Sequence, residues 1–259
     1  MEPDRRRIKP VTWLLALRNF SLSVLFPAGC AICRKPLDWS HVDPVCPACW
    51  MKVRPIEGPI CYRCGYPISA EAGSTPVEEI YCESCQKRSP AYIKARSVFY
   101  YQDILRELVH RFKYQGQVNI GKMLARYMIR YWSIEPDFLT SGCIIPVPLG
   151  IKKLRKREFN QSFILAREIG RHLRIRVYPL AMRKVRDGVP QMQLSREERI
   201  QSVRGSFAVA SGQSVEERDV LLVDDVCTTG ATIAECSRVL LHHGAKKVRV
   251  ITLARSMLQ

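Results

Sequence analysis

The sequence predicts an α/β protein, with a mostly parallel sheet flanked by helices and a small cysteine-rich module on its N-terminal side. Two observations lead to this prediction. Apolar strands and amphipathic helices alternate from about residue 91 onward, which is the pattern of right-handed strand–helix–strand units. Before that point, eight cysteines form four C-x-x-C pairs. At 259 residues and 47% hydrophobic content, the chain is long enough for one full domain and a smaller one.

Residues 1–27 form a basic and apolar leader. A basic start followed by an apolar run is also the pattern of a secretory signal peptide. However, Arg18 and Asn19 interrupt the run, and its end falls on the first cysteine pair instead of a good cleavage site. We therefore interpret the leader as a helix that packs on a partner surface. No apolar run reaches the roughly 20 residues that a transmembrane span needs.

The cysteine-rich module is assigned to residues 28–90, ending at Pro90. Its pairs are Cys30 and Cys33, Cys46 and Cys49, Cys61 and Cys64, and Cys82 and Cys85. Two such turns complete a tetrahedral four-sulfur site that suits Zn²⁺ and leaves no open position. Disulfides would require an oxidising compartment, so structural zinc in the cytoplasm is the preferred interpretation. Between pairs lie 12, 11 and 17 residues, which is compatible with sequential or interleaved pairing.

The α/β domain is assigned to residues 91–259. Strands are predicted at 96–101, 143–149, 219–225 and 247–255, and helices at 104–112, 120–131, 160–173 and 231–243. The second strand is stopped by prolines, and Gly244 ends the last helix. In the third helix, Phe163, Ala166 and Ile169 are expected to face inward together with Leu173.

Positive charge is concentrated in this second part of the chain. The formal net charge is +17, of which +14 belongs to residues 91–259. Such an excess favours polyanionic partners, namely nucleic acid, phosphorylated metabolites or anionic lipid. Between residues 152 and 186, 12 Lys and Arg face only two glutamates. The candidate nucleic-acid-binding residues are Lys152, Lys153, Arg155, Lys156, Arg157, Arg167, Arg171 and Arg174.

The segment LLVDDVCTTGAT, residues 221–232, carries the strongest functional signal. Asp224 and Asp225 stand at the end of a buried strand, the edge at which α/β sheets bind ligands. Carboxylates do not bind phosphate, so we expect them to hold sugar hydroxyls or Mg²⁺. The loop that follows, residues 228–232, offers hydroxyls, amides and a helix N-terminus to a phosphate. The sequence therefore predicts a site for a phosphorylated ribose.

The same string closely resembles the phosphoribosyl pyrophosphate (PRPP) motif of type I phosphoribosyltransferases. Other segments narrow the resemblance to the ComF family of competence proteins, which combines a double zinc ribbon with this domain. They are FKYQG (112–116), IPVPL (145–149), REFNQ (157–161), QMQLSREER (191–199) and GSF (205–207). Three positions differ from the family pattern: Glu158 replaces a usual glycine, Val189 a common threonine and Ser202 an expected asparagine.

The resemblance implies roles for individual residues. The two acidic residues contact the ribose and are the candidate catalytic residues, while Mg²⁺ accompanies PRPP. The residues implied in PRPP binding are Asp224, Asp225, Thr228, Thr229, Gly230, Ala231, Thr232, Pro146, Val147, Pro148, Leu149, Lys113 and Tyr114. Residues 183–204 resemble the hood that closes over PRPP and excludes water.

Three functions are compatible with these features. The preferred one is a cytoplasmic PRPP-binding protein that handles single-stranded DNA during natural transformation, together with a protein of the DNA-uptake machinery. The alternative is an active enzyme that transfers phosphoribose from PRPP to a base or amine. A third is a scaffold whose zinc ribbon docks a partner such as a helicase.

Overall fold

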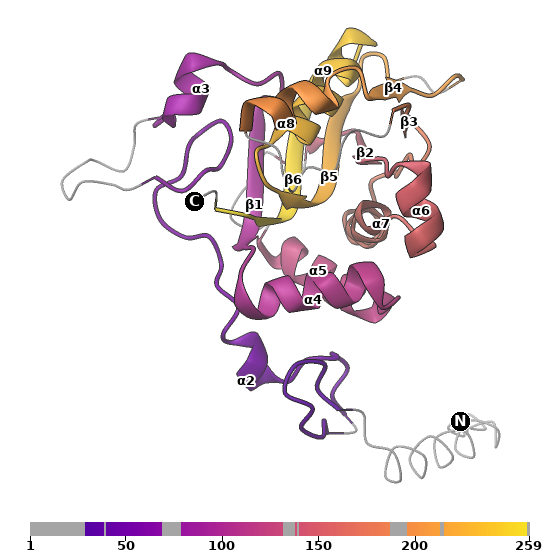
Figure 1. Cartoon of the computed structure of the whole chain (residues 1–259). Helices are drawn as coiled ribbons and strands as arrows, with labels where there is room; N and C mark the ends of the chain where they lie inside the picture. The colour runs from indigo at the N-terminus through magenta and orange to yellow at the C-terminus, as the bar shows by residue number, and fades with distance from the viewer. Residues whose placement is uncertain are drawn as a thin grey trace, which may run out of the picture. The chain divides into compact units, whose positions relative to one another are not determined.

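The computed structural model describes residues 29–38, 40–68, 79–131, 138, 140–186, 196–212 and 215–257 (Figure 1). The chain divides into two compact units, Met1–Lys52 and Val53–Gln259. The predicted leader helix lies outside the described residues. Within the described ranges, no helix combines the length and the apolar character needed to span a membrane.

The smaller unit is organised around the first two cysteine pairs. Cys30 and Cys49 are buried, and Cys49 lies in the short helix α2 (Pro47–Trp50). The backbone of Ala31 donates to Pro44 O at 2.8 Å, which holds the two C-x-x-C turns together.

The larger unit contains a parallel four-stranded sheet, which confirms the predicted α/β fold. Its strand order is β1 (Lys94–Tyr100), β6 (Lys247–Arg255), β5 (Asp219–Cys227) and β2 (Cys143–Pro146). All three pairings are parallel, and Asp224 lies opposite Thr252. The central strands β5 and β6 are largely buried, as expected for a sheet covered on both faces.

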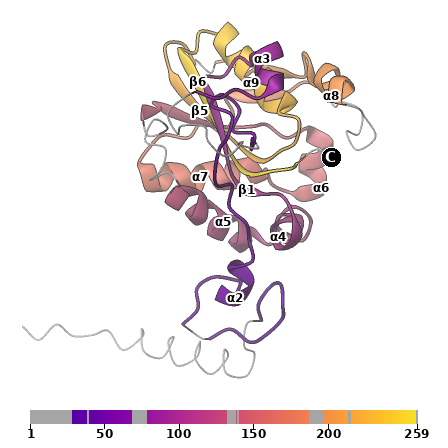
Figure 2. The ribbon, with the colours of Figure 1, turned by 90° about the vertical axis from the view of Figure 1, so that its left-hand side faces the viewer.

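Helices cover both faces of this sheet (Figure 2). One layer consists of α4 (Asp103–Tyr114), α5 (Val118–Tyr131) and α7 (Gln161–Leu173), in which α7 packs on α5, β2 and β5. The other contains α9 (Ala231–His242), α8 (Arg196–Val203) and a two-stranded antiparallel sheet of β3 (Met182–Lys184) and β4 (Phe207–Val209). Val220, Leu222 and Val248 belong to the hydrophobic core of the α9 layer.

The second pair of cysteine turns is part of this larger unit and packs into its core. Cys61, Cys64 and Cys85 share a hydrophobic cluster with sheet and α9 residues, and Cys85 lies in α3 (Glu83–Lys87). Gly65 has φ +65°, and a β-carbon there would lie 2.6 Å from Ala95 O, so only glycine permits this close approach.

Single extended segments cover both edges of the sheet. Along β1, Ile56 donates its backbone N–H to Val98 O at 2.9 Å, and Tyr100 donates to Arg54 O at 3.0 Å. Along β2, Ile144 donates to Arg176 O at 2.9 Å and accepts from the Tyr178 N–H at 2.8 Å.

Some local features differ from the predictions. Helix α6 (Ile151–Arg157) was not predicted because it buries no residue and therefore has no apolar face in the sequence. The small β3–β4 sheet and α8 were also not predicted. In α7, Phe163 and Leu173 were expected to face inward but are half-buried, whereas Ile164 and Leu165 are buried. The inward face of α7 is thus rotated relative to the predicted one.

Glu158 ends α6 with φ +65°, in the left-handed region. This conformation costs a non-glycine residue on the order of 1 kcal/mol, which explains why the family pattern has glycine here. Glu158→Gly is expected to raise the free energy of unfolding by about 0.5–1 kcal/mol. Urea denaturation measures this gain, and Glu158→Ala, which keeps a β-carbon, should show none. An equal gain in both variants would contradict the explanation.

Candidate functional site

An acidic pair lies towards the carboxyl end of β5. The Ser162 hydroxyl, from the first turn of α7, donates to Asp224 Oδ1 at 2.8 Å, and the Asp225 backbone N–H donates to the same oxygen at 2.9 Å. Lys113 Nζ, from the last turn of α4, lies 2.7 Å from Asp225 Oδ2. Three elements far apart in the sequence therefore converge on the two carboxylates.

The environment of the pair perturbs its proton affinities. Burial, followed by the charge of Asp225, raises the pKa of Asp224 to about 7, against the opposing effect of the Ser162 hydrogen bond. Burial acts to lower the pKa of Lys113, but the adjacent Asp225 carboxylate outweighs it and the pKa is raised. Lys113 is therefore a permanent cation, whereas Asp224 changes its charge near neutral pH.

The raised pKa makes stability depend on pH. Because the pKa of Asp224 lies above its unfolded value of 3.8, the folded state binds the proton more tightly, and the contribution of Asp224 to stability falls as pH rises from about 4 to about 7. Asp224→Asn keeps an acceptor for Ser162 without titrating. We expect it to be more stable than the parent by on the order of 1–3 kcal/mol at pH 8, and by less at pH 5. Urea unfolding at both pH values without Mg²⁺ measures the difference in free energy of unfolding between the variant and the parent. A difference that does not change with pH would refute the raised pKa of Asp224.

The segments FKY and REFNQ meet beside the acidic pair. Arg157 donates to the Tyr114 hydroxyl at 2.8 Å and to Gln161 Oε1 at 3.0 Å, with its guanidinium 4.7 Å from the centre of the Tyr114 ring. The Phe112 and Phe159 rings lie 5.6 Å apart. Arg157, one of the candidate nucleic-acid-binding residues, is thus held at this site.

Asn160 links the site to the loop after β2. Its Oδ1 caps α7 by accepting from the Ser162 N–H at 3.0 Å, and its Nδ2 donates to Val147 O at 3.0 Å. Pro146 and Val147 are buried, whereas Pro148 and Leu149 are half-buried. The predicted PRPP residues of this loop are therefore fixed close to the acidic pair through Asn160.

Residues 228–232 turn from β5 into α9. Gly230 has φ +79° and occupies the N-cap position of α9, and Thr229 Oγ1 accepts from the Ala231 N–H at 3.3 Å. Thr228, Thr229 and Thr232 are half-buried. A helix N-terminus that follows a glycine turn directs free N–H groups towards an anion.

The remaining basic candidates lie on different elements. Lys152, Lys153, Arg155 and Lys156 are exposed on α6. Arg167 and Arg171 both lie near Glu168, at 3.3 and 3.5 Å. Arg174 lies beyond α7, in a left-handed conformation with φ +57°.

The eight cysteines of the module form two clusters with sequential pairing. Cys30, Cys33, Cys46 and Cys49 make one, and Cys61, Cys64, Cys82 and Cys85 the other, each with sulfurs within 4.8 Å of one another. Cys33 and Cys46 Sγ lie 3.7 Å apart, and Cys64 and Cys82 Sγ 3.6 Å apart. Tetrahedral Zn²⁺ with bonds of about 2.3 Å places its sulfurs about 3.8 Å apart. Both clusters fit structural zinc.

Ser162 and Asn160 were not among the predicted site residues, although both hold the site together. Asn160 lay within the quoted motif REFNQ, and Ser162 directly follows it. The available signal was an Asn-x-Ser sequence at the predicted start of a helix, where such residues cap the free N–H groups.

Comparison with known proteins agrees with this organisation. A model of the double zinc ribbon domain matches residues 21–86, and a model of the phosphoribosyl transferase domain matches residues 160–257. Competence protein F of Haemophilus influenzae is 30% identical over 235 residues, covering 89% of this chain and 98% of that protein. DNA utilization protein YhgH of Escherichia coli K12 is 28% identical over 236 residues, with coverage of 89% and 98%. Competence protein ComFC of Bacillus subtilis is 29% identical over 225 residues, with coverage of 83% and 85%.

Proposed function

Because this chain belongs to the ComF family of competence proteins, we propose that it binds PRPP or a related phosphoribosyl ligand and handles single-stranded DNA in the cytoplasm during natural transformation. The relatives are named for competence and for DNA utilization. A protein of the DNA-uptake machinery is the proposed partner.

The observation that carries the proposal is the convergence of Ser162, Lys113 and the acidic pair beside the glycine turn of α9. Asp224 and Asp225 accept from the ribose hydroxyls, since carboxylates at a strand end are strong acceptors. The N–H groups and hydroxyls of residues 228–232 bind the 5′-phosphate. Arg157 and Tyr114 lie at the rim of the same site.

The pyrophosphate of PRPP needs cations. The residues proposed to face it are Pro146, at the end of β2, and Val147, Pro148 and Leu149 in the loop that follows. The exposed cations of α6 come next in the chain. Mg²⁺, bound together with PRPP, would neutralise the charge on the pyrophosphate. Hard oxygen donors are what Mg²⁺ prefers, and the carboxylates of the acidic pair supply them.

Single-stranded DNA is proposed to bind through the exposed cations of α6, with Arg171 and Arg174 nearby in sequence as secondary contacts. Backbone phosphates attract such side chains without regard to base sequence, and the affinity then falls with added salt.

A second candidate is an active phosphoribosyltransferase, favoured by the complete set of acidic pair, glycine turn and proline-bounded loop. A ³¹P NMR time course of PRPP with Mg²⁺ and zinc-loaded protein separates the two. We expect broadened PRPP lines without pyrophosphate release, with or without single-stranded DNA and small-molecule cell extract. Pyrophosphate forming faster than in a protein-free control would establish the enzyme instead, and unchanged PRPP lines would refute PRPP binding.

A further inference from the structure

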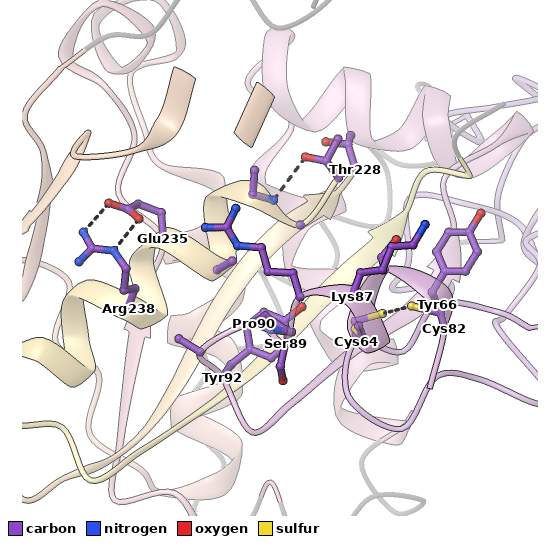
Figure 3. A pocket seen from close by; sticks show the side chains of 18 of the residues that line it. Cys64, Tyr66, Cys82, Lys87, Ser89, Pro90, Tyr92, Thr228, Glu235 and Arg238 are labelled. Atoms are coloured by element: carbon purple, nitrogen blue, oxygen red, sulfur yellow. Dashed lines mark hydrogen bonds and ion pairs between the residues drawn. The ribbon is translucent and has the colours of Figure 1, made fainter. Parts of the chain in front are cut away.

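A pocket with a volume of about 810 Å³ adjoins the proposed phosphate loop (Figure 3). This volume lies in the range of about 300–1,000 Å³ that is typical of pockets for small molecules. Its walls come from the second cysteine cluster and α3, from the end of α8, and from α9. Thr228, Thr229 and Gly230 line it as well, so the pocket extends directly from the loop, along α9.

The charged residues of the lining are mostly cations. Five basic side chains, Lys87, Arg88, Arg204, Arg238 and Arg255, accompany two acidic ones, Glu83 and Glu235. Both acidic side chains already have partners. Glu83 forms an ion pair with Lys87, and Glu235 forms an ion pair with Arg238 and accepts a hydrogen bond from the Gly205 N–H. Arg88 and Arg204 are exposed and have no ion pair within the described part of the chain.

Arg255 adds a buried donor to this lining. Its side chain is only 4% exposed, its Nη2 donates to Cys64 O, and its Nε has no hydrogen-bond partner among the described residues. A Zn²⁺ held by four thiolates carries two negative charges, and Arg255 offsets part of them. The unpaired Nε remains, and a buried donor without a partner is costly unless a ligand satisfies it.

We infer that the 5′-phosphate held by residues 228–232 is a phosphodiester and that this pocket receives the chain beyond it. The ligand is then the 3′-terminal nucleotide of a DNA single strand. Its free 3′-hydroxyl lies at Asp224 and Asp225, its 5′-phosphate lies in the loop, and the preceding nucleotide occupies the pocket.

The direction of the strand follows from chemistry. A carboxylate can accept a hydrogen bond from a furanose hydroxyl only if that hydroxyl is not esterified. In DNA, only the 3′-terminal nucleotide has a free 3′-hydroxyl. The strand must then leave through its 5′-phosphate, on the side where Arg88 and Arg204 provide cations. Tyr66, half-buried in the lining, adds an aromatic ring whose centre lies 5.7 Å from the Arg255 guanidinium. This inference rests on the proposed function, because it uses the same phosphate loop.

The test compares the binding of three oligothymidylates to the full-length zinc-loaded protein by fluorescence anisotropy. They are a linear strand with a 3′-hydroxyl, the same strand with a 3′-phosphate, and a circle of the same length. We expect the 3′-hydroxyl strand to bind about tenfold more tightly than the other two, which corresponds to the gain from one or two charge-assisted contacts. PRPP should compete away this difference but not the residual binding.

Arg88→Gln combined with Arg204→Gln should remove most of the preference for the 3′-hydroxyl strand and leave PRPP affinity unchanged. The matched control is Lys246→Gln combined with Lys247→Gln, two exposed cations at the opposite end of the sheet, which should keep the preference. Equal affinity for all three strands would overturn the inference, and so would a preference that survives the Arg88 and Arg204 substitutions. PRPP titration of the parent protein distinguishes the two failures: if PRPP binds without any end preference, only the inference fails.

Discussion

Cys61→Ser is expected to unfold the larger unit, whereas Cys30→Ser should leave it folded. Cys61 is fully buried in the core of the α9 layer, and its cluster is fastened to the sheet by the Arg255 hydrogen bond to Cys64 O. Structural Zn²⁺ contributes on the order of 10 kcal/mol, comparable to the entire stability of a domain, about 5–15 kcal/mol. The Cys30 cluster belongs to the separate unit Met1–Lys52.

Zinc content, thermal unfolding and PRPP titration together measure this asymmetry. The Cys30 variant should lose one zinc ion and keep both the unfolding transition of the larger unit and its PRPP affinity. The Cys61 variant should lose the zinc ion of the other cluster, the unfolding transition of the larger unit and the affinity for PRPP. If the two variants behaved alike, the first cluster would be as necessary to the larger unit as the second, contrary to the division of the chain.

Asp224→Asn combined with Asp225→Asn should abolish PRPP binding, weakening it by at least about 100-fold. Each carboxylate that accepts from a ribose hydroxyl contributes about 1.5–3 kcal/mol as a charge-assisted bond, and 1.4 kcal/mol corresponds to a factor of ten. Binding of a circular single strand, which has no end, should change less than twofold because it uses the exposed cations. Isothermal titration with PRPP and anisotropy with the circle measure the two affinities.

The double variant also leaves Lys113 without its 2.7 Å partner, so a folding control is required. Asp219→Asn is the matched control: it removes a carboxylate from the opposite end of β5, 3.6 Å from Arg249, and should retain PRPP affinity. Loss of PRPP and circle binding together, in a variant with a native circular dichroism spectrum, would show that both ligands share one site. Unchanged PRPP affinity would remove the acidic pair from the proposed site.

The parallel sheet was predictable because its strands are buried on both faces and read as apolar runs, such as LLV before Asp224. The zinc clusters were predictable because repeated C-x-x-C pairs are typical of four-cysteine zinc sites. Their sequential pairing could be seen only in the structure. Helix α6 escaped prediction because Ile151 and Leu154 are exposed and no buried stripe marks it.

The candidate site was predictable where ligand chemistry dictates the sequence, as in the acidic pair and glycine turn. Where a residue acts by supporting another, the sequence could indicate a helix cap but not the distant group that the residue contacts. Ser162 and Asn160 lie 62 and 13 residues from the groups that they hold, and no local pattern encodes those distances. Sequence spacing also could not show that Arg157 stacks on Tyr114 or that Arg167 and Arg171 lie near one glutamate.

The covered edges of the sheet have a consequence for the isolated domain. An edge strand with free N–H and C=O groups is a template on which a second chain can add, and this leads to aggregation. Residues 54–56 occupy that position along β1, and Pro55, which has no N–H, cannot extend the ladder outward. A fragment that begins at residue 91 would carry every proposed ligand residue of the acidic pair and phosphate loop, yet would expose β1 and self-associate. Residues 54–56 thus protect the sheet of the larger unit from pairing with further copies of itself.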